Sequence, residues 1–218
     1  MNLMSTSDDE PAFVAAVRAL LARVDLATLD WKQYDLGVLR AKLGNELRIH
    51  IWHPSLRTLA TPVARYGGVH DHRFDVTSAV VCGAITDVRY EAHPARANEA
   101  EVPDRAHGTN VEVDGFVKAW QIWPSLGKVN PLNLHAVTEV GRCTVQAGRS
   151  YTVPRRLFHT SFVEDFAVTV VHRSNFDEHP YATILGEGTE GTVPNTPTQV
   201  VAQLLHRARH AILHAEQE

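Results

Sequence analysis

Three histidines in two short stretches of the sequence are the residues best suited to bind a metal. His70 and His72 stand one residue apart in GGVHDHRFDVTSAVVCG, before an apolar run, and His159 lies in GRSYTVPRRLFHTSF. Residues two apart in a β-strand point to the same face, so the first two imidazoles can converge on one ion. The pair alone is weak evidence in a chain with 13 histidines. The prediction therefore depends on the second stretch.

Short β-branched or alternating segments in the middle of the chain predict the strands that must position these histidines. They cover residues 46–53, 61–66, 72–92, 132–140, 142–148, 150–154 and 166–174. Gly, Pro and Asn separate them, which is typical of an all-β sandwich or barrel and not of alternating β–α units. We therefore predict an all-β fold with a barrel at about residues 46–174.

Amphipathic segments at both ends of the chain predict helices that flank the barrel. Residues 10–30 have apolar side chains at helical spacing, and residues 34–43 are expected to form a second short helix. Residues 196–216 also have an apolar stripe of helical period. No linker or internal repeat interrupts the pattern, so we expect a single domain, residues 1–218, with helical flanks at 10–43 and 196–216.

Composition argues against several classes of partner. The formal net charge of the 218 residues is −4, whereas nucleic acids and anionic membranes bind a basic face, so we expect neither. No apolar run approaches the roughly 20 residues that span a bilayer, and the acidic N-terminus is unlike a secretory signal. Cys82 and Cys143 are the only cysteines, and their apolar surroundings favour reduced thiols. These features together predict a cytoplasmic protein.

The first histidine stretch resembles the first motif of the cupin superfamily, whose fold is a small jelly-roll barrel. That motif is G-x5-H-x-H-x3/4-E-x6-G, and His70, His72 and Gly83 match its spacing. Ala64 stands where the motif has its first glycine. With the second motif, the resemblance covers about residues 46–174.

The second histidine stretch is similar to the second cupin motif, G-x5-P-x-G-x2-H-x3-N. Gly148, Pro154 and His159 match its spacing, whereas Arg156 replaces the motif glycine and Val163 the asparagine. The resemblance implies that the histidines of both motifs bind one metal ion inside the barrel.

The glutamate ligand of the first cupin motif is missing. It would fall at Val76, or at Thr77 in the longer form of the motif, and neither is a carboxylate. Asp75 lies one residue earlier, so in a regular strand its side chain points to the opposite face. We favour the three histidines as the complete ligand set, with a bulge that turns Asp75 inward as the alternative. Asp75 is also a candidate catalytic residue, and a cupin that has lost its metal is the third reading.

Among cupins, the chain resembles the cysteine dioxygenase-like, three-histidine non-haem iron enzymes. These also contain H-D-H, lack the glutamate and have the third histidine in the second motif, and LRIHIWHP is similar to the strand before their H-D-H. The resemblance implies Fe(II), although imidazole also suits Zn, Ni and Cu, and Mn is a further alternative. It further implies O2 and a small chelating substrate, because in that family a substrate thiolate and amine bind iron and the sulfur becomes a sulfinate.

The resemblance also implies residues beyond the metal ligands. The family has an upstream arginine that holds the substrate carboxylate, a role open to Arg40 or Arg48, since a guanidinium binds carboxylate through two hydrogen bonds. Tyr151 is a candidate lining residue of the same cavity. The Ser-His-Tyr relay of the family is not matched, and His172 stands in place of its tyrosine. We expect His172 to point into the barrel and to act as an acid or base.

Three functions are compatible with these features. The first is an Fe(II)-dependent oxygenase, thiol dioxygenase-like, which acts on a small polar substrate that chelates the metal. The second is a metal-dependent cupin isomerase, lyase or hydrolase that uses the ion as a Lewis acid. The third is a non-enzymatic cupin that binds a small molecule. The sequence favours the oxygenase, and its terminal helices would allow a homodimer.

Overall fold

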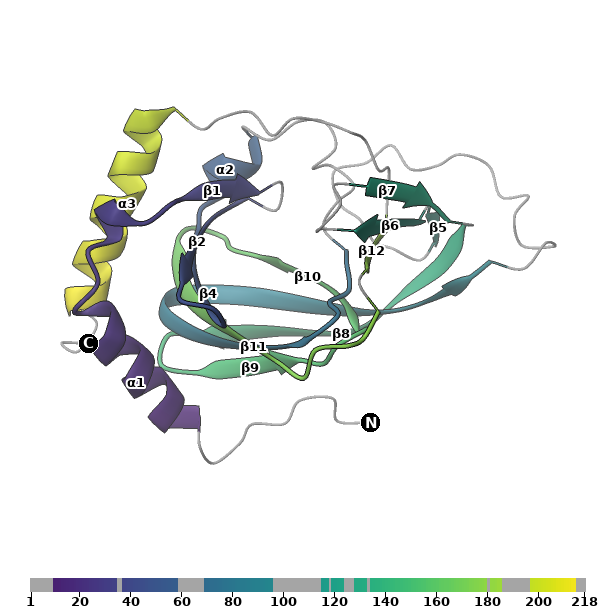
Figure 1. Ribbon diagram of the computed structural model, residues 1–218, viewed down its shortest axis with the longest axis horizontal. Helices are drawn as coiled ribbons and strands as arrows, with labels where there is room; N and C mark the ends of the chain where they lie inside the picture. The colour runs from purple at the N-terminus through teal and green to yellow at the C-terminus, as the bar shows by residue number, and fades with distance from the viewer. Residues whose placement is uncertain are drawn as a thin grey trace.

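The computed structural model describes residues 10–34, 37–58, 69–95, 115–117, 119–123, 128–132, 134–179, 181–185 and 197–214. Within these ranges the chain forms twelve β-strands, three α-helices and one 3₁₀ helix. The helices are α1 (Glu10–Leu21), α2 (Pro54–Thr58) and α3 (Thr198–His214), with the 3₁₀ turn at Leu26–Thr28. The strands therefore dominate, as the sequence predicts (Figure 1).

The strands form two antiparallel sheets. The larger sheet has the order β1-β2-β3-β11-β4-β8-β5, and β9 and β10 also pair with β4. Its strands are β1 (Lys32–Tyr34), β2 (Val38–Leu43), β3 (Leu47–Trp52), β4 (Asp75–Pro94), β5 (Gly115–Val117), β8 (His135–Gln146), β9 (Ser150–Val153), β10 (Phe158–Phe162) and β11 (Ala167–Ser174). The smaller sheet has the order β12-β6-β7 and contains β6 (Ala119–Trp123), β7 (Lys128–Pro131) and β12 (Ala182–Leu185).

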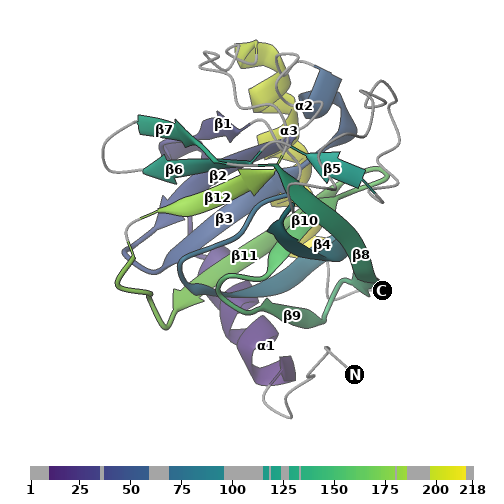
Figure 2. The ribbon, with the colours of Figure 1, turned by 90° about the vertical axis from the view of Figure 1, so that its right-hand side faces the viewer.

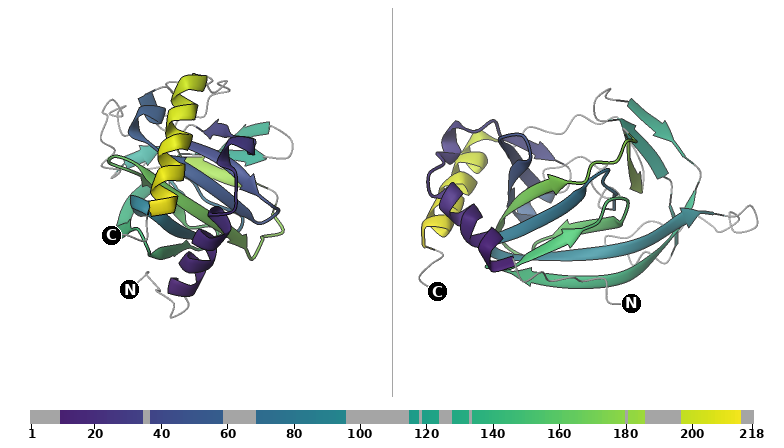
Figure 3. Two further views of the ribbon diagram at one scale, coloured as in Figure 1. Left: turned by 90° about the vertical axis from the view of Figure 1, so that its left-hand side faces the viewer. Right: turned by 60° about the horizontal axis from the view of Figure 1, so that its bottom comes forward.

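Strand β4 joins the two walls of the barrel. It is 20 residues long, several times the usual strand length of about 5–6 residues. Its first half pairs with β11 and β9, and its second half pairs with β8 and β10. Figure 1 and the right-hand view of Figure 3 show β4 running along the barrel from the helix end. One continuous strand therefore positions residues in both walls.

Gly83 lies where β4 passes from one wall to the other. Its φ is +73°, and a Cβ added there would overlap the backbone oxygen of Phe166 on the neighbouring chain segment. Only glycine adopts this left-handed conformation without a steric penalty and also permits so close a backbone approach. The motif glycine predicted at this position is thus explained by backbone packing.

We expect Gly83→Ala to destabilise the protein severely. The left-handed conformation costs roughly 1–2 kcal/mol for a residue with a Cβ, and the overlap with Phe166 adds about 1–3 kcal/mol of overpacking strain. Urea unfolding measures the loss. Gly141→Ala is the matched control, because Gly141 lies on β8 with nothing within 4 Å of its added Cβ. Equal stability of the two variants would contradict this account of Gly83.

Helices α1 and α3 cover the outer face of the wall formed by β2, β3, β11 and β4. They bury an apolar cluster that contains residues from both helices and from all four strands: Val14, Val17, Leu21, Leu39, Ala41, Ile49, Ile51, Ala79, Val81, Val168, Val170, Leu204, Ala208 and Ile212. Figures 1 and 3 show both helices on this side, and in Figure 2, viewed from the opposite side, they lie behind the strands. The helices seal one face of the wall, and the other face lines the interior of the barrel.

The structure confirms the predicted all-β fold, built from antiparallel strands, with a helix near each end. The second N-terminal helix expected at residues 34–43 is wrong, because the chain forms β2 there and the sheet already begins at Lys32. Leu39 and Ala41 pack under the helices while Val38 and Arg40 face the barrel interior. Because β2 is covered on both faces, its sequence lacks the alternation of apolar and polar residues that indicates a strand. The strand expected at 61–66 lies outside the described residues.

Two expectations about cysteines and membranes can be compared with the structure. Cys82 and Cys143 are both free thiols, as predicted, and burial raises the pKa of Cys82 to about 11. A thiol with so high a pKa is a poor nucleophile at neutral pH. No helix in the described ranges is both long enough and apolar enough to cross a membrane.

Candidate metal centre

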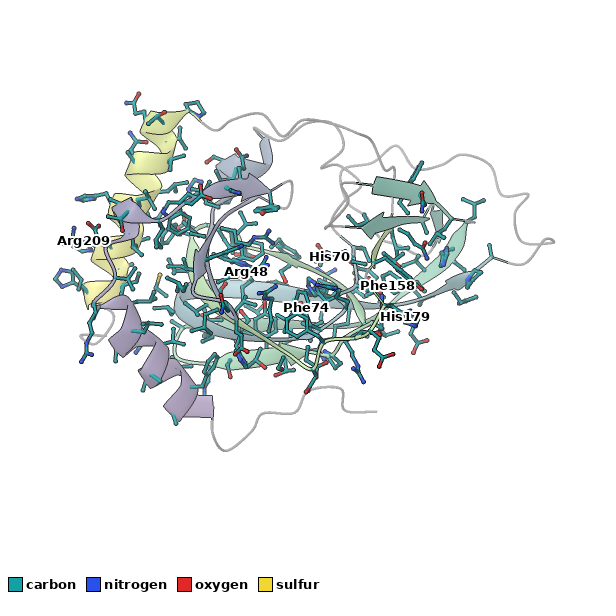
Figure 4. The ribbon with its side chains drawn as sticks, viewed as in Figure 1. Arg48, His70, Phe74, Phe158, His179 and Arg209 are labelled. Carbon is teal, nitrogen blue, oxygen red and sulfur yellow. The ribbon has the colours of Figure 1, made fainter. Side chains whose placement is uncertain are left out.

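The three predicted histidines meet inside the barrel. One ring nitrogen from each of His70, His72 and His159 lies within 4.8 Å of the other two, and the Nε2 atoms of His72 and His159 are 3.0 Å apart. His70 and His159 are cross-strand partners joined by two backbone hydrogen bonds of 2.9 Å. Figure 4 labels His70 and Phe74, which both line a cavity inside the barrel. The backbone pairing of the two motifs thus brings their imidazoles together.

This donor set fits one divalent ion. Two imidazole nitrogens bound at about 2.0–2.1 Å and roughly at right angles are about 3.0 Å apart, the separation found between His72 and His159. Burial, together with the neighbouring His70 and His159, holds the pKa of His72 well below its usual value. A low pKa favours the deprotonated ring that a metal ligand requires. Val76, at the position of the motif glutamate, is buried and lines the adjoining cavity.

A buried carboxylate orients His159. Nδ1 of His159 lies 2.7 Å from Oδ1 of Asp87, and because a carboxylate only accepts, Nδ1 carries the proton and Nε2 is free to bind a metal. Asp87 also accepts hydrogen bonds from Ser161 at 3.2 Å and from Nε of Arg89 at 3.1 Å. The side chains of Asp87 and Arg89 are only 1% and 3% exposed. Asp87 therefore fixes both the tautomer and the direction of the third ligand.

Sequence reasoning missed Asp87 and Arg89, although the sequence contains a signal for them. In AITDVRYEA they are two residues apart, so they share one face of an otherwise apolar strand. Opposite charges in such a strand are rarely buried unless they pair. Pairing of β10 with β4 places His159 opposite Arg89 and Ser161 opposite Asp87. The contact between Asp87 and His159 therefore becomes apparent only from the pairing of β10 with β4.

Arg156 joins the two motifs. It stands where the second cupin motif has glycine, and its φ of 65° keeps the left-handed conformation that glycine usually supplies. Its Nη1 lies 3.3 Å from Oδ2 of Asp71 and its Nε 2.8 Å from Oδ2 of Asp177. The backbone N–H of Thr183 also donates to Asp71. Asp71, between the first two histidines, is therefore held by these contacts and is not a metal ligand.

A cavity of about 110 Å³ adjoins the three histidines. Besides them it is lined by Tyr34, Val38, Arg40, Arg48, His50, Trp52, Phe74, Val76, Ser78, Tyr151, Ser161, Val171 and Arg173. The predicted substrate-binding residues Arg40, Arg48 and Tyr151 are all in this wall. Burial is the main cause that lowers the pKa of both arginines and raises that of Tyr151. Arginine stays protonated at neutral pH, and no Asp or Glu is among the described lining residues, so the cavity wall is cationic.

His172 does not point into the barrel, so the expected orientation is wrong. Its Nε2 is 3.4 Å from Oε2 of Glu46, whose side chain is 68% exposed. Val171 and Arg173, on either side of His172, line the cavity instead. Helices cover the outer face of β11, so both faces of this strand are apolar and the sequence pattern does not reveal which face is inside. His172 is therefore not placed to act on a substrate in the cavity.

Asp75 also lies away from the histidines. Its Oδ1 accepts a hydrogen bond from the backbone N–H of Arg155 and its Oδ2 accepts one from Asn175, both at 2.7 Å. Strand β4 pairs regularly with β9 and β11 next to Asp75, without a bulge at that point. The alternative in which a bulge turns Asp75 inward as a fourth ligand is therefore wrong. Its contacts join neighbouring chain segments and do not reach the cavity.

We expect Asp75→Asn to keep the full metal content. An amide still accepts the hydrogen bond from Arg155, and the loss of one partly exposed polar contact changes the free energy of unfolding by about 0.5–1.5 kcal/mol. Elemental analysis of the purified variant measures the metal-to-protein ratio. Metal loss as large as that in the histidine variants would show that the carboxylate has a direct role at the centre.

Known proteins are similar to this chain in structure and not in sequence. No family model matches the sequence, and no curated protein matches it. Among solved structures, a structure of Drosophila melanogaster CENP-C bound to CAL1 is similar over 75% of this chain and 98% of the matched chain, with a TM-score of 0.33 and 10% identity.

Two enzymes are also among the similar solved structures. An oxalate oxidase matches 81% of this chain and 60% of its own, with a TM-score of 0.29 and 16% identity. A hydroquinone 1,2-dioxygenase from a Sphingomonas species, with 4-hydroxybenzoate bound, matches 88% of this chain and 89% of its own, with a TM-score of 0.32 and 15% identity.

Proposed function

We propose that this protein is a non-haem Fe(II)-dependent oxygenase, thiol dioxygenase-like, that acts on a small anionic substrate able to chelate the metal. The observation that carries the proposal is the set of three clustered imidazoles, with Val76 in place of a carboxylate ligand, beside a cavity walled by arginines. A divalent ion with three neutral ligands retains its full charge, which favours an anionic donor from the substrate. Zn, Ni, Mn or Cu would also fit these ligands.

The residues of this chain have distinct roles in the proposal. His70, His72 and His159 would hold the ion. When bound, the ion would bring the substrate and O2 together and pass electrons from the substrate, which is oxidised, to O2. Asp87 keeps Nε2 of His159 available, as its 2.7 Å contact with Nδ1 indicates. Arg40 and Arg48 bind a carboxylate at the far end of the substrate.

Apolar and titratable side chains complete the cavity. Trp52, Val76 and Val171 line it and would restrict water around the reacting groups. His50 and Tyr151 are titratable cavity residues outside the ligand set. Either would take the proton role that His172, which lies outside the cavity, cannot fill directly.

Anaerobic loading with Fe(II), followed by addition of candidate substrates, tests the proposal. A chelating thiol, amino acid or diketone should change the iron spectrum before O2 is admitted and should then cause stoichiometric O2 uptake. His70→Ala is the inactive control. A metal-loaded protein whose spectrum no chelating substrate changes would overturn the oxygenase proposal and favour the Lewis-acid isomerase or lyase, whereas a folded protein that binds no metal would favour a non-enzymatic binding protein.

A further inference from the structure

Three arginines line one wall of the cavity in a diagonal row, with Arg48 between Arg40 and Arg173. On the inner face of the sheet, Arg48 has Val171 as its direct partner across β11 and Lys42 across β2. Arg173 is two residues after Val171, and Arg40 is two residues before Lys42, so each is a diagonal neighbour of Arg48. Side chains as long as arginine reach such diagonal neighbours. All three arginines line the cavity, and Figure 4 shows Arg48 in the barrel interior.

These guanidinium groups lack an acidic partner within the cavity. None of the lining residues that the structure describes is Asp or Glu. The nearby Glu46 carboxylate is 68% exposed and contacts His172 on the other face of the wall. Its charge raises the pKa of Arg173, but burial and the neighbouring Arg48 and Arg73 outweigh this effect. Tyr34 has its ring 3.6 Å below the guanidinium of Arg40, and Arg173 donates one hydrogen bond of 2.6 Å to the backbone oxygen of Asn45. These contacts hold the side chains in place but do not neutralise them.

Several polar atoms in this wall are buried without a hydrogen-bond partner among the described residues. They are Nε of Arg48, Nε of Arg173 and both ring nitrogens of His50. Buried donors without partners are unfavourable and uncommon in native proteins. Burial lowers the pKa of all three arginines, and mutual repulsion adds to this effect. An anionic ligand would satisfy the donors and relieve the repulsion at once.

We infer that the substrate carries a second anionic group with two negative charges or two acidic functions, bound by Arg40, Arg48 and Arg173 opposite its metal-binding donors. This inference rests on the proposed function and extends it by adding Arg173 and by specifying the charge at the far end of the substrate. A single carboxylate would leave two of the three guanidinium groups uncompensated. A phosphoryl group or a dicarboxylate provides enough charge and enough acceptor oxygens. The neutral His50 would donate one further hydrogen bond.

Anion binding to the metal-free full-length protein tests the inference. Inorganic phosphate and succinate are titrated at constant ionic strength, with acetate as the single-charge control, and thermal unfolding and intrinsic tryptophan fluorescence are recorded. We expect phosphate, succinate or both to raise the Tm and perturb the fluorescence well below the concentration at which acetate acts. Phosphate and succinate then distinguish a phosphoryl group from a dicarboxylate. Binding of acetate with equal affinity would overturn the inference.

Substitution of the arginines provides a second, independent test of the inferred anion site. Arg48→Gln and Arg173→Gln should each weaken binding of the effective anion by about tenfold or more, because each removes charge-assisted hydrogen bonds. Without anion, both variants should unfold at the same or a higher temperature than the parent, since repulsion is relieved. The control is Arg142→Gln, which removes an exposed arginine paired with Glu139 on β8. Unchanged anion affinity in both cavity variants would refute the role of the cluster.

This design separates the inference from the proposed function. Anion binding is measured without metal, so a protein that binds dianions but shows no O2 uptake would retain the inferred anion site and lose the oxygenase proposal. A protein that consumes O2 with a monoanionic substrate, and shows no preference for dianions, would retain the oxygenase and lose the inference.

Discussion

Replacement of His70, His72 or His159 by alanine is expected to reduce metal affinity by more than about 100-fold, since even the outer-shell partners of metal-bound histidines contribute roughly 10–100-fold. Each variant leaves two of the three nitrogens that cluster within 4.8 Å. The fold should persist, because His70 and His159 are joined through their backbones and not through their rings. Elemental analysis and competition with a chelator measure the loss of metal.

His206→Ala is the matched control for these variants. His206 is exposed on α3, at the outer surface of the protein, so its removal tests whether any histidine affects metal content. Circular dichroism of all four variants checks that the fold is retained. Unchanged metal stoichiometry in the three site variants, with intact folds, would refute the assignment of the centre.

Asp87→Asn is expected to weaken both the metal centre and the fold. The amide removes the charge that fixes His159, which should reduce metal affinity roughly 10–100-fold. It also leaves Arg89, whose side chain is 3% exposed, without its buried counter-charge. Breaking a buried ion pair in this way destabilises a protein by about 3–5 kcal/mol. Urea unfolding and chelator competition measure the two effects separately.

A double variant distinguishes the two roles of Asp87. Arg89→Met in the Asp87→Asn background removes the unpaired charge, so most of the lost stability should return. Metal affinity should stay low, because no carboxylate then faces Nδ1 of His159. Recovery of metal affinity together with stability would show that Asp87 acts only through the fold.

The local features of this protein were predictable from the sequence because they depend on neighbours along the chain. His70 and His72 share a face as a consequence of strand geometry, and the terminal helices follow from their apolar period. The spacing of Gly83 from these histidines indicated a cupin motif. The structure supplies the physical reason, a left-handed backbone pressed against Phe166.

Features that depend on which face of a strand is inside were not predictable from one sequence. Residues 38–43 and β11 are covered on both faces, by helices on one side and the barrel interior on the other. The alternation of apolar and polar residues is then lost. For this reason residues 34–43 were predicted to be a helix, and His172 was predicted to point into the barrel. For the same reason Arg173, which follows His172 in the chain and lines the cavity, was not predicted as a site residue.

The pairing of distant strands decided the chemistry around the centre. The sequence determined that three imidazoles were available and that no glutamate stood at the usual position. Only the register of β10 on β4 placed His159 beside Asp87, and only the order β2-β3-β11 placed the three arginines in one wall of the cavity. Such pairings join residues more than a hundred positions apart in the sequence, as between Arg48 and Val171. Their energies depend on burial and charge in the folded barrel, which local sequence patterns do not encode.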